Sequence, residues 1–267
     1  MKPFFSIITP TLNEEKFLPK LLTNLSKQKK SNFEVIIVDG ISDDRTKQIA
    51  EEFKKKIPLT FLEAEERNVS RQRNNGAHKA SGQYLIFLDA DLGIGPSFTE
   101  KLEAFIEKKK GLILLPTMMP DERKPETKAV FQISNMIIEA SQNIGRPIPS
   151  PGALIMEKGI FVKIGGYDEK MSLGEDQEIL KRAQDWGVRA KFLPTIKVRF
   201  SLRRAKKEGR LRTFYKFALS TSHILFTGKL KDKIFEYEMG GQYHLEKDKK
   251  KDYVEDYFKK IKAYFLP

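Results

Sequence analysis

Unbroken apolar runs that alternate with amphipathic segments constrain the fold of this chain more than any other feature of its sequence. Val35 to Val38 and Tyr84 to Leu88 are such runs, and Asp43 to Lys55 carries Ile49 and Phe53 at helical spacing. Strands that are buried on both faces do not alternate polar with apolar residues, and they occur in parallel sheets that have helices on both sides. The sequence therefore predicts an α/β fold with a mostly parallel central sheet.

The predicted elements follow one another as strand, loop and helix along the first 200 residues. We expect strands at residues 4–9, 35–38, 59–62, 84–88, 112–115 and 153–156. We expect helices at residues 15–28, 43–55, 97–109, 124–144 and 175–186. In a Rossmann-like sheet of this kind ligands bind beyond the carboxyl ends of the strands, which is where Asp39, Asp89 and Asp91 lie.

The composition limits the size and the chemistry of the molecule. The chain has 267 residues, 40% of them hydrophobic, which is enough for one or two domains with a sizeable core. It has no cysteine and three histidines, so disulfides and thiolate zinc sites are excluded and any metal must bind carboxylates. The N-terminus lacks the pattern of a signal peptide, and no uncharged apolar run reaches about 18 residues, which predicts a cytoplasmic protein.

The excess of basic charge is concentrated near the C-terminus. The chain has a net charge of +13, and much of it falls in residues 201–267. We expect a larger domain at 1–200 and a basic, mainly helical extension at 201–267. Lysines and arginines flank the apolar stretch Phe214 to Phe226, so residues 203–233 fit two interpretations: peripheral binding to an anionic membrane surface, or a helix packed on the domain with a solvated basic rim.

A pair of carboxylates follows one of the apolar strands directly. Asp89 and Asp91 are two residues apart and come after the run YLIFL, at the point where a buried strand meets solvent. Paired acids suit Mg²⁺ or Mn²⁺, which take one or two protein carboxylates and complete their shells with water and substrate phosphates. The alternative is a pair of turn or helix-capping aspartates.

Four segments, in this order, resemble one known family. They are FFSIITPTLNEE at 4–15, EVIIVDGISDDRT at 34–46, RNNGAHKASGQYLIFLDADL at 73–92 and GGYDEKMSLGEDQEILKRAQDWG at 165–187. On these motifs residues 1–200 resemble the family-two glycosyltransferases, which are inverting nucleotide-sugar enzymes of the GT-A fold. The resemblance therefore implies a GT-A fold for the larger domain.

The resemblance also implies a place for the sugar donor. It assigns Asp39 to the nucleobase and ribose, Arg73 to the neighbourhood of the diphosphate, and the first loop to the nucleotide, through Pro10, Thr11, Asn13 and Glu14. A carboxylate at a strand end accepts hydrogen bonds from hydroxyl and base N–H groups, and the guanidinium fork suits phosphate. Each residue has a structural alternative: turn and N-cap roles in the first loop, loop initiation at Asp39, and a solvated helix face at Arg73.

Catalysis is implied at the start of a helix. Glu175 and Asp176 match the family's Glu-Asp motif, in which the Asp is the catalytic base, and stabilisation of the helix N-terminus is the structural alternative. Asp91, aided by Asp89 directly or through ribose or water, would hold Mn²⁺ or Mg²⁺ against the nucleoside diphosphate. The expected reaction is an inverting transfer of one sugar to a hydroxyl acceptor, either lipid-linked or a glycan.

Two other functions are alternatives to this reaction. The positive charge suits a nucleic-acid-binding protein, but no nucleic-acid motif accompanies it, so no nucleic-acid partner is expected. A nucleotide-sugar pyrophosphorylase is the nearer alternative, although the glycine-rich loop of such enzymes is missing at residues 10–13. The Q-x-x-R-W motif of processive polysaccharide synthases is also absent, which favours the transfer of a single sugar.

Overall fold

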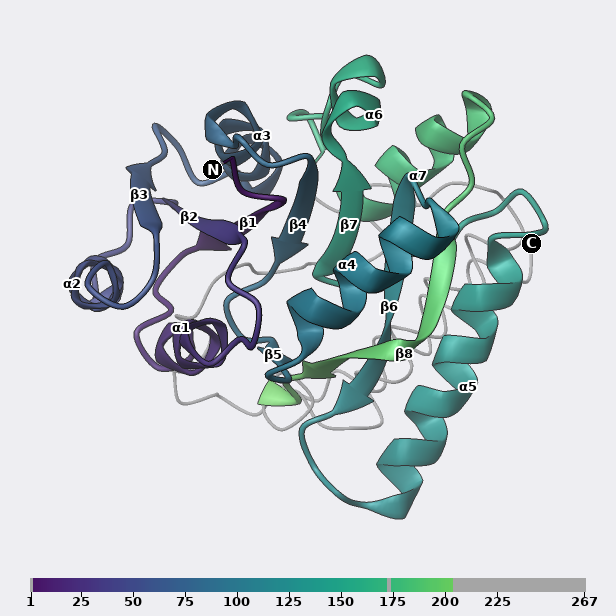
Figure 1. Ribbon diagram of the computed structural model, residues 1–267, viewed down its shortest axis with the longest axis horizontal. Coiled ribbons are helices and arrows are strands. Elements are labelled where there is room, and N and C mark those ends of the chain that lie inside the picture. Colours follow the sequence, from purple (N-terminus) through teal and green to yellow (C-terminus); the bar gives the residue numbers. More distant parts are fainter. Residues whose placement is uncertain (1, 172–173, 204–267) are drawn as a thin grey trace, which may run out of the picture.

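The computed structural model describes residues 2–171 and 174–203 (Figure 1). The strands in these ranges are β1 Phe5–Thr11, β2 Phe33–Asp39, β3 Leu59–Glu63, β4 Tyr84–Leu88, β5 Gly93–Ile94, β6 Ile113–Pro120, β7 Ala153–Glu157 and β8 Lys191–Phe200. The helices are α1 Leu18–Ser26, α2 Thr46–Phe53, α3 Val69–Lys79, α4 Phe98–Lys109, α5 Pro125–Ser141, α6 Lys158–Lys163 and α7 Glu175–Asp185.

The strands form one sheet in the order β3-β2-β1-β4-β7-β6-β8-β5. The first four strands of this order are parallel, and β6 is parallel to β8. β7 is antiparallel to both of its neighbours, and β5 is antiparallel to β8. The long, curved β8 reaches from β6 to the short β5 (Figure 1). The prediction of a mostly parallel α/β sheet is confirmed.

Helices cover both faces of this sheet. Ile7 and Ile37 pack in the layer that contains α1, α2 and α4, whereas their neighbours Ile8 and Ile36 pack in the layer that contains α3, α5, α6 and α7. All four isoleucines are fully buried, so both faces of each strand are covered. This two-sided burial explains why the strands are unbroken apolar runs.

The sequence analysis missed several elements. It gave none for α3, β5, α6 or β8. Its strands at 4–9 and 112–115 are too short, because β1 continues to Thr11 and β6 continues to Pro120. β8 contains a proline and several charged residues, and much of it is exposed. Its pairing with β6 includes an irregularity at Pro116 and Thr117. The position of β8 therefore depends more on its pairing with β6 than on the pattern of its own residues.

The topology brings several polar strand ends to one edge of the sheet. In the parallel pair of β1 and β2, Thr11 lies opposite Asp39. In the antiparallel pair of β4 and β7, Leu88 lies opposite Ala153, and the amide of Asp89 donates to the carbonyl of Gly152 at 2.9 Å. The ends of β1, β2 and β4 and the start of β7 therefore supply one candidate site.

No helix within 2–171 or 174–203 is long and apolar enough to cross a membrane. The predicted helical extension at 201–267 and the predicted membrane contact of 203–233 concern residues that, after Arg203, lie outside the described part of the chain.

Candidate functional site

Asp39 ends β2, and its carboxylate is fixed by its neighbours. Its Oδ1 accepts hydrogen bonds from the hydroxyls of Thr11 at 2.8 Å and Ser42 at 2.6 Å, and its Oδ2 accepts from the amide of Ser42 at 2.7 Å. Asp39 is buried, and Pro10 lies opposite Val38 in the adjoining strand pair. A carboxylate oxygen has lone pairs for more than one donor, so Asp39 can still accept from a ligand.

Asn13 joins the first loop to the loop after β2 through two hydrogen bonds. Asn13 has a φ of 55°, a left-handed conformation that asparagine tolerates better than most residues. Its side-chain oxygen accepts from the amide of Asp43 at 2.9 Å, and its own amide donates to the hydroxyl of Ser42 at 2.8 Å. Gln72, which the sequence analysis missed, donates from its amide side chain to the carbonyl of Thr11 at 2.9 Å.

The acids of the Asp-Ala-Asp motif bind two different arginines. Asp89 Oδ1 lies 3.0 Å from Arg73 Nη2, and Asp91 Oδ2 lies 2.8 Å from Arg203 Nε. Gly152 lies against Asp89, and a Cβ at this glycine would be 2.3 Å from Asp89 Oδ2. Gly152 also has a φ of +66°, a conformation that L side chains rarely adopt. Both carboxylates therefore face cationic groups at the edge of the sheet.

Arg73 is the centre of a buried cluster of charge. It lies on α3 with only 2% of its surface exposed. One terminal nitrogen, Nη1, lies 2.8 Å from Glu175 Oε1 and 3.3 Å from Asp176 Oδ1, while Nη2 binds Asp89. The guanidinium carbon lies 5.1 Å from the centre of the Tyr167 ring. The surrounding acids hold the pKa of Arg73 well above its ordinary value, because they outweigh the cost of burial.

Asp176 lies in the first turn of α7, which begins after Gly174 in a left-handed conformation with φ of 82°. Burial raises the pKa of Asp176 from its ordinary 3.8 to about 6. The charges of Glu175 and Asp89 act in the same direction, whereas Arg73 and Tyr167 oppose them. Asp176 is therefore a carboxylate that exchanges a proton close to neutral pH.

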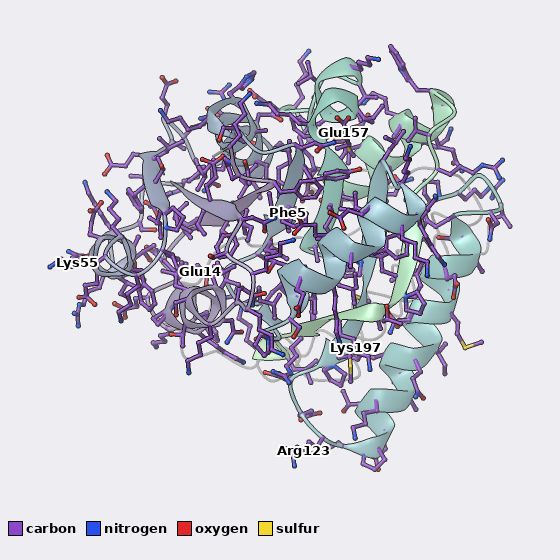
Figure 2. The ribbon with its side chains drawn as sticks, in the orientation of Figure 1. Phe5, Glu14, Lys55, Arg123, Glu157 and Lys197 are labelled. Atoms are coloured by element: carbon purple, nitrogen blue, oxygen red, sulfur yellow. The ribbon has the colours of Figure 1, made fainter. Side chains whose placement is uncertain are left out.

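Glu14 makes a forked ion pair with Arg203. The two terminal nitrogens of Arg203 lie 2.8 and 2.9 Å from the two carboxylate oxygens of Glu14, and its guanidinium carbon lies 4.8 Å from the centre of the Phe17 ring. Burial raises the pKa of Glu14 from 4.5 to about 7, although the arginine acts against this shift. Figure 2 shows Glu14 beside α1. The sequence analysis assigned Arg203 to the basic C-terminal segment and missed this contact.

The predicted site residues thus form three groups. Asp39, Thr11 and Asn13 line the ends of β1 and β2; Arg73 joins Asp89 to Glu175 and Asp176; and Arg203 joins Glu14 to Asp91. Chemically, they offer acceptors for a base or ribose, a carboxylate pair for a cation, and a buried acid that can take a proton.

The carboxylate pair has the chemistry of a shared cation site. Among the described residues, no group of three or more His, Cys, Asp or Glu side chains is arranged to hold a metal ion. Mg²⁺ and Mn²⁺ need only one or two protein carboxylates when phosphate oxygens and water complete the shell. Asp89 and Asp91 each bind a guanidinium group, so a cation at this pair would share the carboxylates with Arg73 and Arg203.

Comparison with known proteins decides the family. The sequence model of the family described as "Glycosyl transferase family 2" matches residues 6–165, which is more than half of the chain. The chain belongs to this family. The matched range includes the first loop, Asp39, Arg73, Asp89 and Asp91, whereas the acids at the start of α7 follow it. The predicted family and its GT-A fold are confirmed.

Two relatives show how much of the chain is shared. Poly(ribitol-phosphate) beta-N-acetylglucosaminyltransferase TarS of Staphylococcus aureus is 36% identical over 118 residues, which are 43% of this chain and 21% of TarS. An uncharacterized glycosyltransferase of Haemophilus influenzae is 31% identical over 179 residues, 66% of this chain and 60% of that protein. The chain therefore matches only about a fifth of the length of TarS.

Solved structures share the fold. The crystal structure of TarS 1–349 in complex with UDP-GlcNAc has a TM-score of 0.62 and 26% sequence identity, covering 76% of this chain and 59% of the TarS chain. The mannosyltransferase PcManGT of Pyrobaculum calidifontis, in complex with GDP-Man and Mn²⁺, has a TM-score of 0.66 at 19% identity, covering 82% of this chain and 65% of that one. The second likeness concerns the fold alone.

Proposed function

We propose that the chain transfers one sugar from a nucleoside-diphosphate sugar to a hydroxyl acceptor, with inversion and with the help of a divalent cation. The observation that carries this proposal is that buried Asp176 and Asp89 of the Asp-Ala-Asp motif bind the same guanidinium, that of Arg73. A group that can take a proton is therefore linked, through Arg73, to the carboxylate of Asp89. Membership of the glycosyltransferase family supports the same reaction.

The donor binds at the ends of the first strands in this proposal. Asp39 accepts hydrogen bonds from the base or ribose, and Thr11 and Ser42 hold its carboxylate in place for this. Asn13 and Pro10 line the nucleotide from the first loop. When bound by Asp91 and Asp89, Mn²⁺ or Mg²⁺ would neutralise charge on the diphosphate leaving group. Arg73 and Arg203, which bind these acids, would contribute to the same neutralisation.

Asp176 is the base in this mechanism. Its carboxylate takes the proton of the acceptor hydroxyl while the acceptor oxygen bonds to the anomeric carbon. The bond from that carbon to the diphosphate oxygen breaks, and its electron pair leaves with the nucleoside diphosphate. A base with a pKa of about 6 is ionised at neutral pH and still basic enough to assist proton transfer. Because there is a single displacement, the configuration inverts.

Binding and product analysis test this function. We would measure the binding of UDP-GlcNAc, GDP-Man, UDP and GDP by calorimetry, once with Mn²⁺ and once with a chelator. Metal-dependent binding of one of them is expected, together with weaker Mn²⁺ binding by Asp91→Asn. NMR of the product formed with a panel of hydroxyl acceptors should show an inverted anomeric centre. Equal affinity with and without metal would remove the cation from the mechanism, and retention of configuration would remove the single displacement.

The released product separates this function from the nearer alternative. A transferase releases a nucleoside diphosphate, whereas a pyrophosphorylase releases pyrophosphate. Because the family match includes the first loop, where the glycine-rich motif is missing, we expect the nucleoside diphosphate. The localisation, the class of acceptor and any contact with an anionic membrane remain predictions from the sequence.

A further inference from the structure

Tyr167 lies at the centre of the contacts around Asp176, although no role was predicted for it. It lies in the loop before α7 and is 2% exposed. Its hydroxyl donates a hydrogen bond to Asp176 Oδ1 at 3.1 Å. Arg73 Nη1 binds the same oxygen, at 3.3 Å. Both hydrogen bonds that the described residues make to this carboxylate therefore end on Oδ1, and Oδ2 is left for another partner.

The rest of Tyr167 is held firmly. Its ring meets the Phe87 ring edge to face, with the centres 5.2 Å apart, and lies under the guanidinium of Arg73. Its backbone amide donates to the side-chain oxygen of Asn74 at 2.9 Å, and its carbonyl accepts from the side-chain nitrogen of Asn74 at 2.9 Å. The hydroxyl thus projects from a ring that is held in place, so its hydrogen bond can keep the Asp176 carboxylate in one position.

We propose that Tyr167 is a positioning residue for the base: its hydroxyl holds Oδ1 of Asp176 so that Oδ2 faces the acceptor hydroxyl. This inference rests on the proposed function, because it needs Asp176 to be the base. A carboxylate with one oxygen bound cannot rotate freely about its last bond, so the unbound oxygen keeps one direction. The rate enhancement that a general base provides depends strongly on its precise placement.

The same hydrogen bond favours the ionised form of Asp176. The charged groups that face this carboxylate are Arg73 from α3, Glu175 from α7 and Asp89 after β4. The two acids raise its pKa, whereas Arg73 and the Tyr167 hydroxyl lower it. Tyr167 itself stays protonated, because burial holds its pKa well above the ordinary value. Removal of the hydroxyl should therefore make Asp176 harder to ionise.

The substitution Tyr167→Phe tests this role, because it keeps the ring packing and removes only the hydroxyl. At neutral pH we expect kcat to fall by about tenfold, and the acid limb of the rate profile to move up by about one pH unit. Donor affinity, measured by calorimetry, should not change. Tyr84→Phe is the matched control, since Tyr84 is also buried and its hydroxyl binds the carbonyl of Gly111 at 3.0 Å. Tyr84→Phe should alter neither kcat nor the pH dependence of the rate.

A second variant covers the case in which Tyr167→Phe folds poorly. Fluorinated tyrosine at position 167 keeps the hydroxyl and makes it a stronger donor, so the acid limb should move to lower pH. A Tyr167→Phe profile identical to the wild type, or a shift of the same sign in both variants, would overturn the proposal.

A double substitution separates this inference from the proposed function. If Tyr167 acts through Asp176, Tyr167→Phe should lower the residual rate of Asp176→Asn by less than twofold, whereas a full additional tenfold loss would overturn the positioning role. Asp176→Asn alone tests the base. If that single variant transfers sugar at the wild-type rate, the assignment of Asp176 is wrong and the role of Tyr167 is lost with it.

Discussion

Arg73 Nη2 lies 3.0 Å from Asp89 Oδ1, so the acid next to the proposed cation shares its arginine with the proposed base. The side chain of Arg73 is almost fully buried, and three carboxylates depend on its charge.

Loss of Arg73 should destabilise the fold. Arg73→Met leaves Glu175 and Asp176 without their buried cation, which should lower the free energy of unfolding by about 3–5 kcal/mol. Urea denaturation at pH 7.5 measures this. Arg71→Met is the matched control on the same helix, since Arg71 is about one third exposed and pairs with Glu66 and Glu169. It should cost less than about 1 kcal/mol. Equal losses in the two variants would contradict the central role of Arg73.

Asp176→Asn should separate binding from turnover. Donor and Mn²⁺ affinities should stay nearly constant, while kcat falls by about 10²–10⁴, as expected when a general base is lost. In the wild type, the rate should fall with decreasing pH below about 6, where Asp176 becomes protonated. Steady-state kinetics from pH 5 to 8 would show both effects. Thermal denaturation must accompany them, because loss of an acid at a helix start can cost about 0.5–2 kcal/mol.

Glu14 should make stability depend on pH in a direction unusual for an acid. Its folded pKa of about 7 lies above the ordinary 4.5, so the folded state binds this proton more tightly than the unfolded chain does. The resulting stability is fully present below about pH 4.5 and is lost as the pH rises through about 7. Compared with Glu14→Gln, the wild type should therefore lose about 1–3 kcal/mol over this interval.

Urea denaturation of both proteins at pH 5, 6 and 7.5 measures the difference, and Glu15→Gln provides the neighbouring control. A difference between wild type and Glu14→Gln that is constant with pH would show that burial does not govern this group.

Gly152→Ala should disturb Asp89 through a steric clash. The new methyl group would lie 2.3 Å from Asp89 Oδ2, and residue 152 has a positive φ. Gly145→Ala is the matched control, because Gly145 has a φ of +76° but nothing within 4 Å of an added Cβ. Both should lose about 1–2 kcal/mol of stability from backbone strain. Only Gly152→Ala should also lower Mn²⁺ affinity and transfer, which calorimetry and kinetics would show. A matching loss of activity in Gly145→Ala would refute this account.

The sequence predicts the ends of β2 and β4 well because they depend on local pattern, whereas the predicted ends of β1 and β6 fall short of Thr11 and Pro120. Asp39, Asp89 and Asp176 each mark a change from a buried run or loop to a new element, and the structure brings the last two to one arginine. Arg203 could not be found in this way, because its partners Glu14 and Asp91 are distant in sequence. The contact of Tyr167 with Asp176 spans only nine residues, but it depends on how the Tyr167 ring packs against Phe87 and Arg73. Gly152 is similar: its contact with Asp89 follows from the pairing of β7 with β4, which the sequence does not specify. A buried arginine on α3 is likewise a property of the assembled layers.

The ion pair of Glu14 and Arg203 joins positions 189 residues apart. A contact of such long range cannot form until the sheet between its partners is in place, since closing so large a loop has a high entropic cost. During synthesis from the N-terminus, Glu14 and Asp91 leave the ribosome long before the cation that neutralises them. A nascent chain that stops short of residue 203 therefore lacks the guanidinium that bridges Glu14 and Asp91, and this contact is completed only after residue 203 has been made.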